Sequence, residues 1–405
     1  MNDKWKRPFL TIAAGQTGSL IGSSAVQFAL IWWLAVKTDS PMVLSLAGLV
    51  AFLPSFLLGP FAGVFIDRCK KKTVVIAADL AIGLLSGAFA LYFQASDPPY
   101  WIVFVILGLR GVGGVFHAPA IQALIPRLVP GEELMKANGW SQFMQSGAFM
   151  LGPVIGGLLY GAFSMPVILL TDLLGAIIAC ATVFSVRVEG DTPAPRAPQS
   201  AFFREMKEGL TVFRDDAALR GILVATFLIM LFYMPLSSLY PLMTSSYFQL
   251  DAVYGSIVEF TYALGMLLIA LVMAPLGKRF GKITLVYMGL LIIGVSTLAC
   301  GVLPAAPILW FWVFAAACLC MGAGANFYNI PLMAYMQETI KPELMGRAFS
   351  LWSMVMSLAM PLGLLIAGPV AEKYGVAPWF FVSGVIVVVI AAIGYVLVRK
   401  RLPVK

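Results

Sequence analysis

The sequence predicts an all-α integral membrane protein with twelve transmembrane helices in two six-helix pseudo-repeats. The first observation is composition: 60% of the 405 residues are apolar and only 11% are charged. Soluble domains carry about 45–50% apolar and about 25% charged residues. A spanning helix needs about 20 residues, so twelve would use about 240, which matches the apolar content of the chain. The other two observations are the spacing of apolar runs and an internal repeat.

Twelve apolar runs, separated by charged or Pro/Gly-rich breaks, mark the expected spans. The first run is far longer than the apolar core of a signal peptide and more runs follow it, so we expect no cleaved leader. The expected spans cover residues 9–36, 42–66, 73–94, 100–124, 138–162 and 166–188, followed by 219–246, 253–276, 283–303, 308–332, 346–370 and 377–398.

The segment 189–218 interrupts this pattern and divides the chain. It opens on a Pro-rich stretch at 191–198, which favours a flexible or extended linker. Apolar residues then alternate with basic ones at the spacing of an amphipathic surface helix, from Phe202 to Arg214. We therefore expect an N-terminal six-helix half at 1–188, a cytoplasmic linker with an amphipathic helix at 189–218, and a C-terminal six-helix half at 219–405.

Lysine and arginine lie almost entirely on one side of the expected spans. With the amino terminus in the cytoplasm, 24 of the 27 fall in inner segments, Lys37 and Lys373 fall outside, and Arg110 lies within a span. Cytoplasmic loops carry such an excess. We therefore expect a multi-pass protein of the plasma (inner) membrane with both termini in the cytoplasm. The net charge of +8 then faces anionic membrane lipids, and no nucleic-acid partner is expected.

The two halves repeat at offsets of 210 to 212 residues. The segment from Gly63 to Lys72 recurs in degraded form at 274–282, and Pro119 matches Pro331. Parallel repeats of this kind are typical of transporters, whose binding site lies near the midplane between the halves.

Polar stripes on several spans predict a cavity, because polar residues inside a membrane are costly unless they face protein or water. The alternative is hydrogen bonding between helices with no cavity. Aromatic and methionine surfaces with few polar groups suit amphipathic substrates and low selectivity. The expected substrate-binding residues are Gln27, Met144, Tyr233, Tyr240, Tyr262 and Asn326.

Three motifs resemble signatures of the major facilitator superfamily and, within it, of proton-driven drug exporters. The first is the loop from Gly63 through Asp67 and Arg68, which departs from the family pattern at Lys70. The second is Arg110-x-x-x-Gly114 in the fourth span. The third is Gly152-Pro153-x-x-Gly156-Gly157 in the fifth span, which is similar to the exporter signature although Ala148 replaces its leading glycine. Further stretches, such as Phe116–Ala120 and Leu128–Pro130, resemble the macrolide-efflux branch.

The resemblance implies conformational gating by two of these motifs. Asp67 and Arg68 could fasten the inner surface through the orphan donors of a facing helix N-terminus, or the basic residues of this loop could simply follow the positive-inside rule. In the fifth span, Pro153 kinks the helix and Gly152, Gly156 and Gly157 permit close contact. Ordinary close packing is the alternative for the second motif.

Ionisable residues within the spans are candidates for proton coupling. Arg110 lies about 15 Å into its span and Glu259 about 10 Å into another. Glu259 can load a proton on one side and release it on the other, with Arg110 as a fixed charge and Asp172 as the next carboxyl. The alternatives are a structural salt bridge for Arg110 and structural acids at Asp79, Asp172 and Glu259. Sodium coupling also remains open.

These observations predict a monomeric exporter of amphipathic drugs or natural products by proton antiport, with macrolide-type antibiotics as the class that the resemblance implies. Exporters of sugars, peptides or siderophores have the same architecture, and a non-transporting scaffold is a further alternative. We expect no enzyme, because no paired acids or Ser/His/Asp set lies at a plausible depth. We expect no cofactor or metal: no ATP-binding motif occurs, the five cysteines form no even set, and His117 is the sole histidine.

Overall fold

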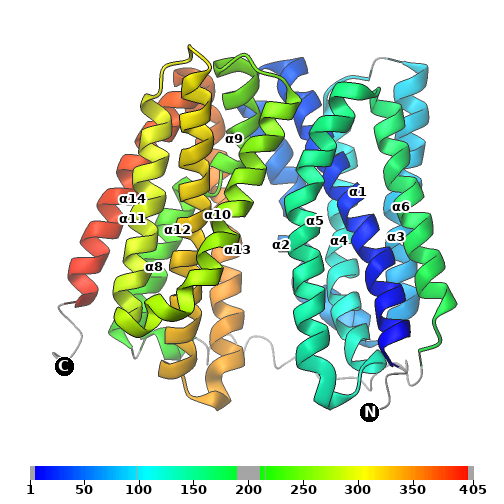
Figure 1. Ribbon diagram of the computed structural model, residues 1–405, viewed down its shortest axis with the longest axis horizontal. Coiled ribbons are helices and arrows are strands. Elements are labelled where there is room, and N and C mark those ends of the chain that lie inside the picture. The colour runs from blue at the N-terminus through cyan, green and yellow to red at the C-terminus, as the bar shows by residue number, and fades with distance from the viewer. Residues whose placement is uncertain (1–4, 97, 189–209, 215, 400–405) are drawn as a thin grey trace. The chain divides into compact units, whose positions relative to one another are not determined.

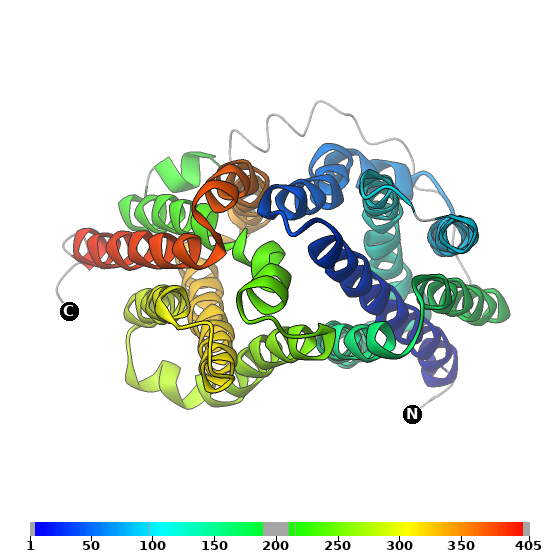
Figure 2. The same cartoon turned by 90° about the horizontal axis from the view of Figure 1, so that it is seen from above.

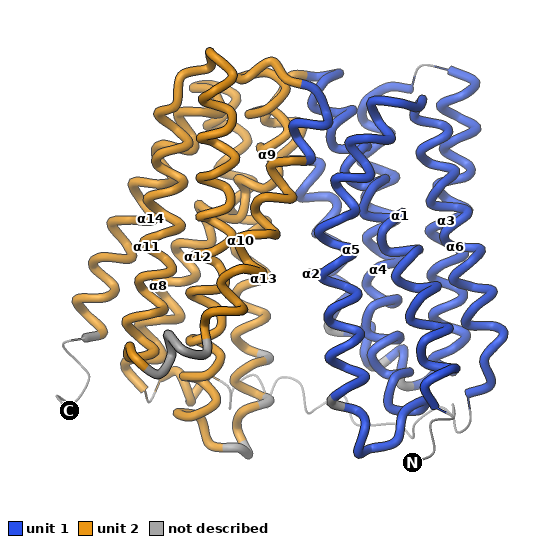
Figure 3. Tube along the Cα trace, in the orientation of Figure 1, with its two compact units in different colours: residues 1–38, 47–196, 251–256 blue, residues 39–46, 197–250, 257–405 orange. Residues whose placement is uncertain are grey.

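The structure, a computed structural model, describes residues 5–96, 98–188, 210–214 and 216–399. Within them, twelve helical segments are long and apolar enough to cross a membrane. The all-α membrane architecture predicted from the sequence is therefore confirmed. The chain divides into two compact units, which are coloured separately in Figure 3.

Unit 1 comprises residues 1–38, 47–196 and 251–256. Within it, α1 packs against α5 and α6, and α3 packs against α4 and α6 (Figure 1). Its helices are α1 (Lys6–Thr38), α2 (Pro41–Asp67, from residue 47 on), α3 (Lys71–Ala95), α4 (Trp101–Leu128), the 3-10 turn η2 (Gly131–Glu133), α5 (Leu134–Ala162) and α6 (Met165–Ser185).

Unit 2 comprises residues 39–46, 197–250 and 257–405. Here α11 packs against both α12 and α14, and the red α14 lies beside the green α8 when the molecule is viewed from above (Figure 2). Its helices are α8 (Ala217–Tyr233), α9 (Leu236–Leu242), the π-helical η3 (Met243–Tyr247), α10 (Ala252–Arg279, from residue 257 on), α11 (Lys282–Val302), α12 (Leu309–Thr339), α13 (Pro342–Tyr374) and α14 (Val376–Arg399).

Helices α4 and α12 are among those that run further than their apolar runs predicted. Helix α4 continues to Leu128 and α12 to Thr339, whereas the expected spans end at 124 and 332. Prolines lie inside both helices, with Pro331 within α12. Neighbouring helices re-satisfy the backbone groups that a proline frees in a membrane protein, so a proline does not have to end the helix.

The expected seventh span is not one continuous helix. Helix α8 ends at Tyr233 and α9 begins at Leu236, because Pro235 has no N–H to donate to the carbonyl of Leu231. Gly363 of α13 packs at this break, where a Cβ would come within 2.6 Å of the Pro235 ring. A π-helical turn then closes the segment, and such turns often occur at functional sites.

The two units do not follow the predicted division of the chain throughout. The start of α2 belongs to unit 2, where the Glu372 carboxylate accepts hydrogen bonds from Ser40 Oγ at 2.7 Å and from the backbone N–H of Met42 at 3.0 Å. The start of α10 belongs to unit 1, where Ser256 packs against Gly157. These short segments pack on helices that are remote in sequence, which apolar runs alone do not reveal.

Most of the predicted linker, residues 189–209 and 215, lies outside the described residues. Residues 210–214 are helical, and the buried Phe213 ring lies 6.3 Å from the ring of Trp352. The amphipathic helix across the rest of the segment stays a prediction.

Candidate functional site

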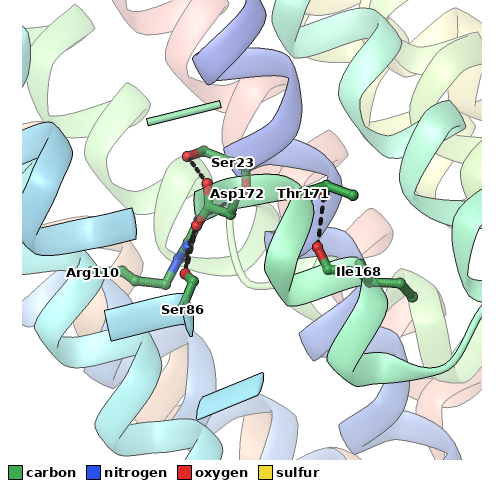
Figure 4. A network of polar contacts seen from close by, with 6 residues as sticks. All are labelled: Ser23, Ser86, Arg110, Ile168, Thr171 and Asp172. Atoms are coloured by element: carbon green, nitrogen blue, oxygen red, sulfur yellow. Dashed lines mark hydrogen bonds and ion pairs between the residues drawn. The ribbon is translucent and has the colours of Figure 1, made fainter. Parts of the chain in front are cut away.

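A buried ion pair joins α4 and α6 in unit 1. The guanidinium of Arg110 contacts the carboxylate of Asp172, and their side chains are 7% and 1% exposed. Two hydroxyls complete the shell of the carboxylate, since Ser86 Oγ and Ser23 Oγ each donate to it at 2.6 Å (Figure 4). The structure therefore brings together two of the three residues predicted for proton coupling.

The same pair is further tied to its surroundings through Arg110. One guanidinium nitrogen donates to Ser86 Oγ at 2.8 Å, and the other donates to the carbonyl of Ser23 at 3.0 Å. Arg110 Nε is buried and has no partner within the described residues. Breaking a buried pair by removing one partner costs about 3–5 kcal/mol, because an uncompensated charge is left behind. The arrangement thus ties α4 to α6 through an ion pair and its hydrogen bonds.

A second buried network links α1, α3 and α4 of unit 1. Gln16 Nε2 donates to Asp79 Oδ2 at 2.8 Å. His117 Nε2 lies 2.9 Å from Gln16 Oε1 and 3.2 Å from Asp79 Oδ1. Gln16 and Asp79 are almost fully buried. The sequence placed each of these residues in an apolar span, but it did not predict that the three residues contact one another. The signal that could have predicted this contact was Asp79 itself, because an acid inside a span requires a polar partner.

A cavity of about 290 Å³ opens beside this network in unit 1. It lies between α1, α4 and α5, and Gln16 and His117 form part of its wall. Of the residues predicted to bind substrate, Met144 lines this cavity. The other polar lining residues include Thr17, Ser24, Gln122, Ser141 and Gln145.

Glu259 is the ionisable residue in the middle of α10, in unit 2. No lysine, arginine or histidine occurs between residues 221 and 277. Within the part of the chain that the structure describes, its carboxyl makes no hydrogen bond or ion pair. The Glu259 carboxyl interacts electrostatically with the Tyr240 hydroxyl. Unit 2 therefore holds a membrane carboxyl without a fixed counter-charge.

Three tyrosines gather near this carboxyl. Tyr233 donates its hydroxyl hydrogen to the Tyr262 hydroxyl at 3.1 Å, and both interact electrostatically with their neighbour Tyr240. The Tyr240 hydroxyl lies 3.9 Å from Met321 Sδ. The three predicted tyrosines of unit 2 thus form one cluster, and Tyr240 is the member that interacts with Glu259.

The two remaining residues predicted to bind substrate are not gathered with these groups. The Asn326 amide donates to the carbonyl of Met266 at 2.8 Å, so it bridges α12 to α10. Gln27 is partly buried on α1 and does not line the cavity beside His117.

The glycines of the fifth-span motif lie at close helix contacts. A Cβ at Gly156 would approach the carbonyl of Ala25 to 2.6 Å, and one at Gly152 would collide with Ser24. A Cβ at Gly157 would lie 2.7 Å from the carbonyl of Ala252. These glycines therefore allow α5 to approach α1 and the start of α10 within unit 1.

The loop motif after α2 is less constrained. A Cβ added at Gly63 would meet nothing within 4 Å, and the Arg68 side chain is exposed. The backbone of Asp67 ends α2, whereas its side chain lies outside what the structure describes. The proposed fastening by Asp67 and Arg68 stays a prediction.

Comparison with known proteins identifies the family. A family model of the Major Facilitator Superfamily matches residues 12–363 and, in an overlapping match, residues 222–405. The chain belongs to the Major Facilitator Superfamily. It is therefore a multi-pass membrane transporter and not an enzyme. Within the described residues, no group of three or more His, Cys, Asp or Glu side chains could hold a metal ion.

Two curated relatives and one solved structure illustrate the similarity. The chain is 39% identical to macrolide efflux protein A of Streptococcus pyogenes over 96% of both chains. It is 38% identical to macrolide efflux protein A of Enterococcus faecalis over 80% of this chain and 99% of that one. The crystal structure of a D323A mutant of the nucleoside transporter NupG matches with a TM-score of 0.77 at 12% identity, over 96% of this chain and 99% of that one. At that identity, the structural match concerns the fold alone.

Proposed function

We propose that this superfamily member exports amphipathic, macrolide-type antibiotics across the plasma membrane in exchange for protons, by alternating access. The observation that carries the substrate class is the 39% identity to macrolide efflux protein A over 96% of both chains. Nearly complete coverage means that all twelve spans contribute to the likeness.

Proton exchange rests on Glu259. While it is enclosed in a low-dielectric part of the protein, a carboxyl without a counter-charge is stable only in its neutral, protonated form. When the site opens to the more basic cytoplasm, the proton leaves and the carboxylate is hydrated. Arg110 and Asp172 act here as a charge pair that holds α4 and α6 in register, with Asp172 as the second candidate carrier of the proton.

Met144 lines the cavity of unit 1, and Tyr233, Tyr240 and Tyr262 form a cluster in unit 2; both groups are assigned to substrate binding in this proposal. Thioether and aromatic groups adapt to large apolar molecules of varied shape. Gln27 of unit 1 and Asn326 of unit 2 are the further residues assigned to substrate binding. Gly152, Pro153, Gly156 and Gly157 permit α5 to bend and slide against α1, while Gly63, Asp67 and Arg68 fasten the cytoplasmic side. Both chain ends lie in the cytoplasm in this proposal.

The test is accumulation of labelled erythromycin in everted proteoliposomes with an acidic lumen. We expect the wild type to accumulate drug. Glu259→Gln should exchange drug across the membrane without accumulating it, because the neutral amide retains the shape of the protonated acid. The matched control is Glu338→Gln, since Glu338 is an exposed carboxyl at the end of α12 that pairs with Lys282.

Three outcomes would contradict parts of the proposal. If wild-type vesicles move drug no faster than empty vesicles under any gradient, the protein is not a macrolide exporter. Accumulation driven by a sodium gradient instead of a pH gradient would replace the coupling ion. If Glu259→Gln accumulates drug like the wild type, the proton is carried elsewhere, and Asp172→Asn is the next variant.

A further inference from the structure

The network of Asp79, Gln16 and His117 has a defined direction of hydrogen bonding. His117 Nε2 faces two oxygens, the amide oxygen of Gln16 at 2.9 Å and the carboxylate of Asp79 at 3.2 Å. Neither oxygen has a hydrogen to give while Asp79 is ionised and Gln16 donates through its nitrogen. The hydrogen of the neutral imidazole therefore resides on Nε2, and Nδ1 carries a lone pair.

The lone pair on Nδ1 is available to a ligand. His117 lines the cavity between α1, α4 and α5, and 12% of its side chain is exposed. Nδ1 has no hydrogen-bond partner within the described residues, and it does not belong to their fully buried polar atoms. A carboxylate behind the ring fixes the tautomer and the orientation of the imidazole, as it does where carboxylate–histidine pairs support metal ligands.

We propose that His117 Nδ1 is a docking point for the protonated amine of a cationic substrate, and that a proton competes with this amine for the same lone pair. In the loaded state the ammonium donates to Nδ1, and the negative charge of Asp79 balances it through Nε2–H. In the unloaded state a proton on Nδ1 gives an imidazolium that Asp79 neutralises equally well. The inference deepens the proposed export function and rests on it. It assigns the substrate class as amphipathic amines.

The other charges near His117 leave this balance intact. Arg110, two turns away on α4, is already neutralised by Asp172 of α6, and Cys180 of α6 donates to the carbonyl of Ile76 at 3.6 Å. No ionisable side chain occurs at 8–36 of α1 or at 137–159 of α5. Lys71 and Lys72 lie at the start of α3, about two turns before Asp79, so Asp79 is the charge in direct contact with His117.

The size of the cavity fits part of a drug and not the whole of one. Pockets for drug-sized molecules span about 300–1,000 Å³, so about 290 Å³ admits the amine-bearing end of a large molecule. The polar wall, with Gln122, Ser141 and Gln145, suits a hydroxylated amine such as an amino sugar. The apolar body of the substrate would then extend beyond this cavity.

The experiment compares two probes that differ only at nitrogen: erythromycin, a tertiary amine that is protonated below pH 7.5, and its N-oxide, which has no N–H to donate. Binding to the purified full-length protein is measured between pH 7.5 and pH 5.5. Wild-type affinity for erythromycin should fall roughly tenfold over this range, since one competing proton weakens binding by up to about tenfold per pH unit. N-oxide affinity should change less than about twofold.

Two variants separate the inference from the proposed function. His117→Gln should remove the pH dependence of erythromycin binding, whereas Gln142→Asn, on α5 outside the cavity wall, should keep it. Asp79→Asn should weaken erythromycin binding at pH 7.5 about tenfold or more, because the charge-assisted partner is lost. This second arm decides the matter if His117→Gln does not fold.

The inference is overturned if pH dependence persists in His117→Gln, if the N-oxide shares it, or if Asp79→Asn binds erythromycin like the wild type. Uphill transport by the wild type would leave the proposed function standing in each of these cases. If the wild type neither binds nor transports erythromycin at any pH, both proposals fail together.

Discussion

The two units hold their membrane carboxyls in opposite conditions. In unit 1, Asp172 pairs with Arg110 and accepts two hydroxyl hydrogen bonds, and Asp79 is bonded to Gln16 and His117. In unit 2, Glu259 has neither a hydrogen bond nor an ion pair within the described residues. Neutralising a paired carboxylate breaks its ion pair and weakens its hydrogen bonds, whereas neutralising an unpaired one has little structural cost.

This difference predicts that neutralising an acid of unit 1 mainly lowers the stability of the fold, whereas neutralising Glu259 of unit 2 mainly abolishes proton coupling. Neutralising Asp172 leaves the Arg110 guanidinium without its counter-charge and removes one of the two oxygens that accept from Ser23 and Ser86, so it should destabilise unit 1. Neutralising Glu259 removes no hydrogen bond, so the fold of unit 2 should survive while coupling is lost. The variants below test that separation, in order of decreasing expected effect.

Asp172→Asn should have the largest effect on stability. It leaves the buried Arg110 guanidinium uncompensated, which costs about 3–5 kcal/mol. The measurement is the free energy of unfolding in mixed micelles by chemical denaturation. The double variant Arg110→Gln with Asp172→Asn is the control, because removing both charges should recover a large part of the loss. A single variant as stable as the wild type would show that the pair contributes nothing to the fold.

Ser86→Ala should have an intermediate effect. Ser86 Oγ donates to Asp172 and accepts from Arg110, and hydrogen bonds to charged groups contribute about 1.5–3 kcal/mol. Ser357→Ala is the matched control, because Ser357 Oγ bonds only to the Met354 carbonyl of its own helix, at 2.8 Å. If the two serine variants lose equal stability, the hydrogen bonds of Ser86 to Asp172 and Arg110 contribute no more to the free energy of unfolding than an ordinary bond within one helix.

The sequence predicted the helical architecture well because membrane spans obey one rule. Twenty apolar residues satisfy their own backbone only as a helix, so apolar runs located all twelve spans. The seven-residue spacing of Arg110 and His117 places both on one face of α4, and each contacts an acid of a neighbouring helix. Asp172 was expected either as a proton carrier or as a structural acid. It pairs with Arg110 and accepts from Ser23 and Ser86, and its part in proton coupling stays a prediction.

Other features could not be predicted from one chain. The contact of Asp79 with His117 depends on how α3 packs beside α4, and apolar periodicity does not encode that rotation. The break at Pro235 is tolerated because Gly363 of a remote helix fits against it. The placement of Ser40 beside Glu372 likewise joins residues more than three hundred positions apart. Each of these contacts is set by packing between helices and not by local propensity.

Glu259→Gln should have the smallest effect on stability and completes the comparison. The amide has the size and shape of the protonated acid, and no partner within the described part of unit 2 is lost. We expect the free energy of unfolding to change by less than about 0.5 kcal/mol, as for substitutions away from specific contacts. The measurement is the same denaturation series, with Asp172→Asn as the reference for a partnered acid. A loss as large as that of Asp172→Asn would mean that Glu259 is ionised and paired in the folded protein, so the two units would hold their carboxyls alike and the proton would need another carrier.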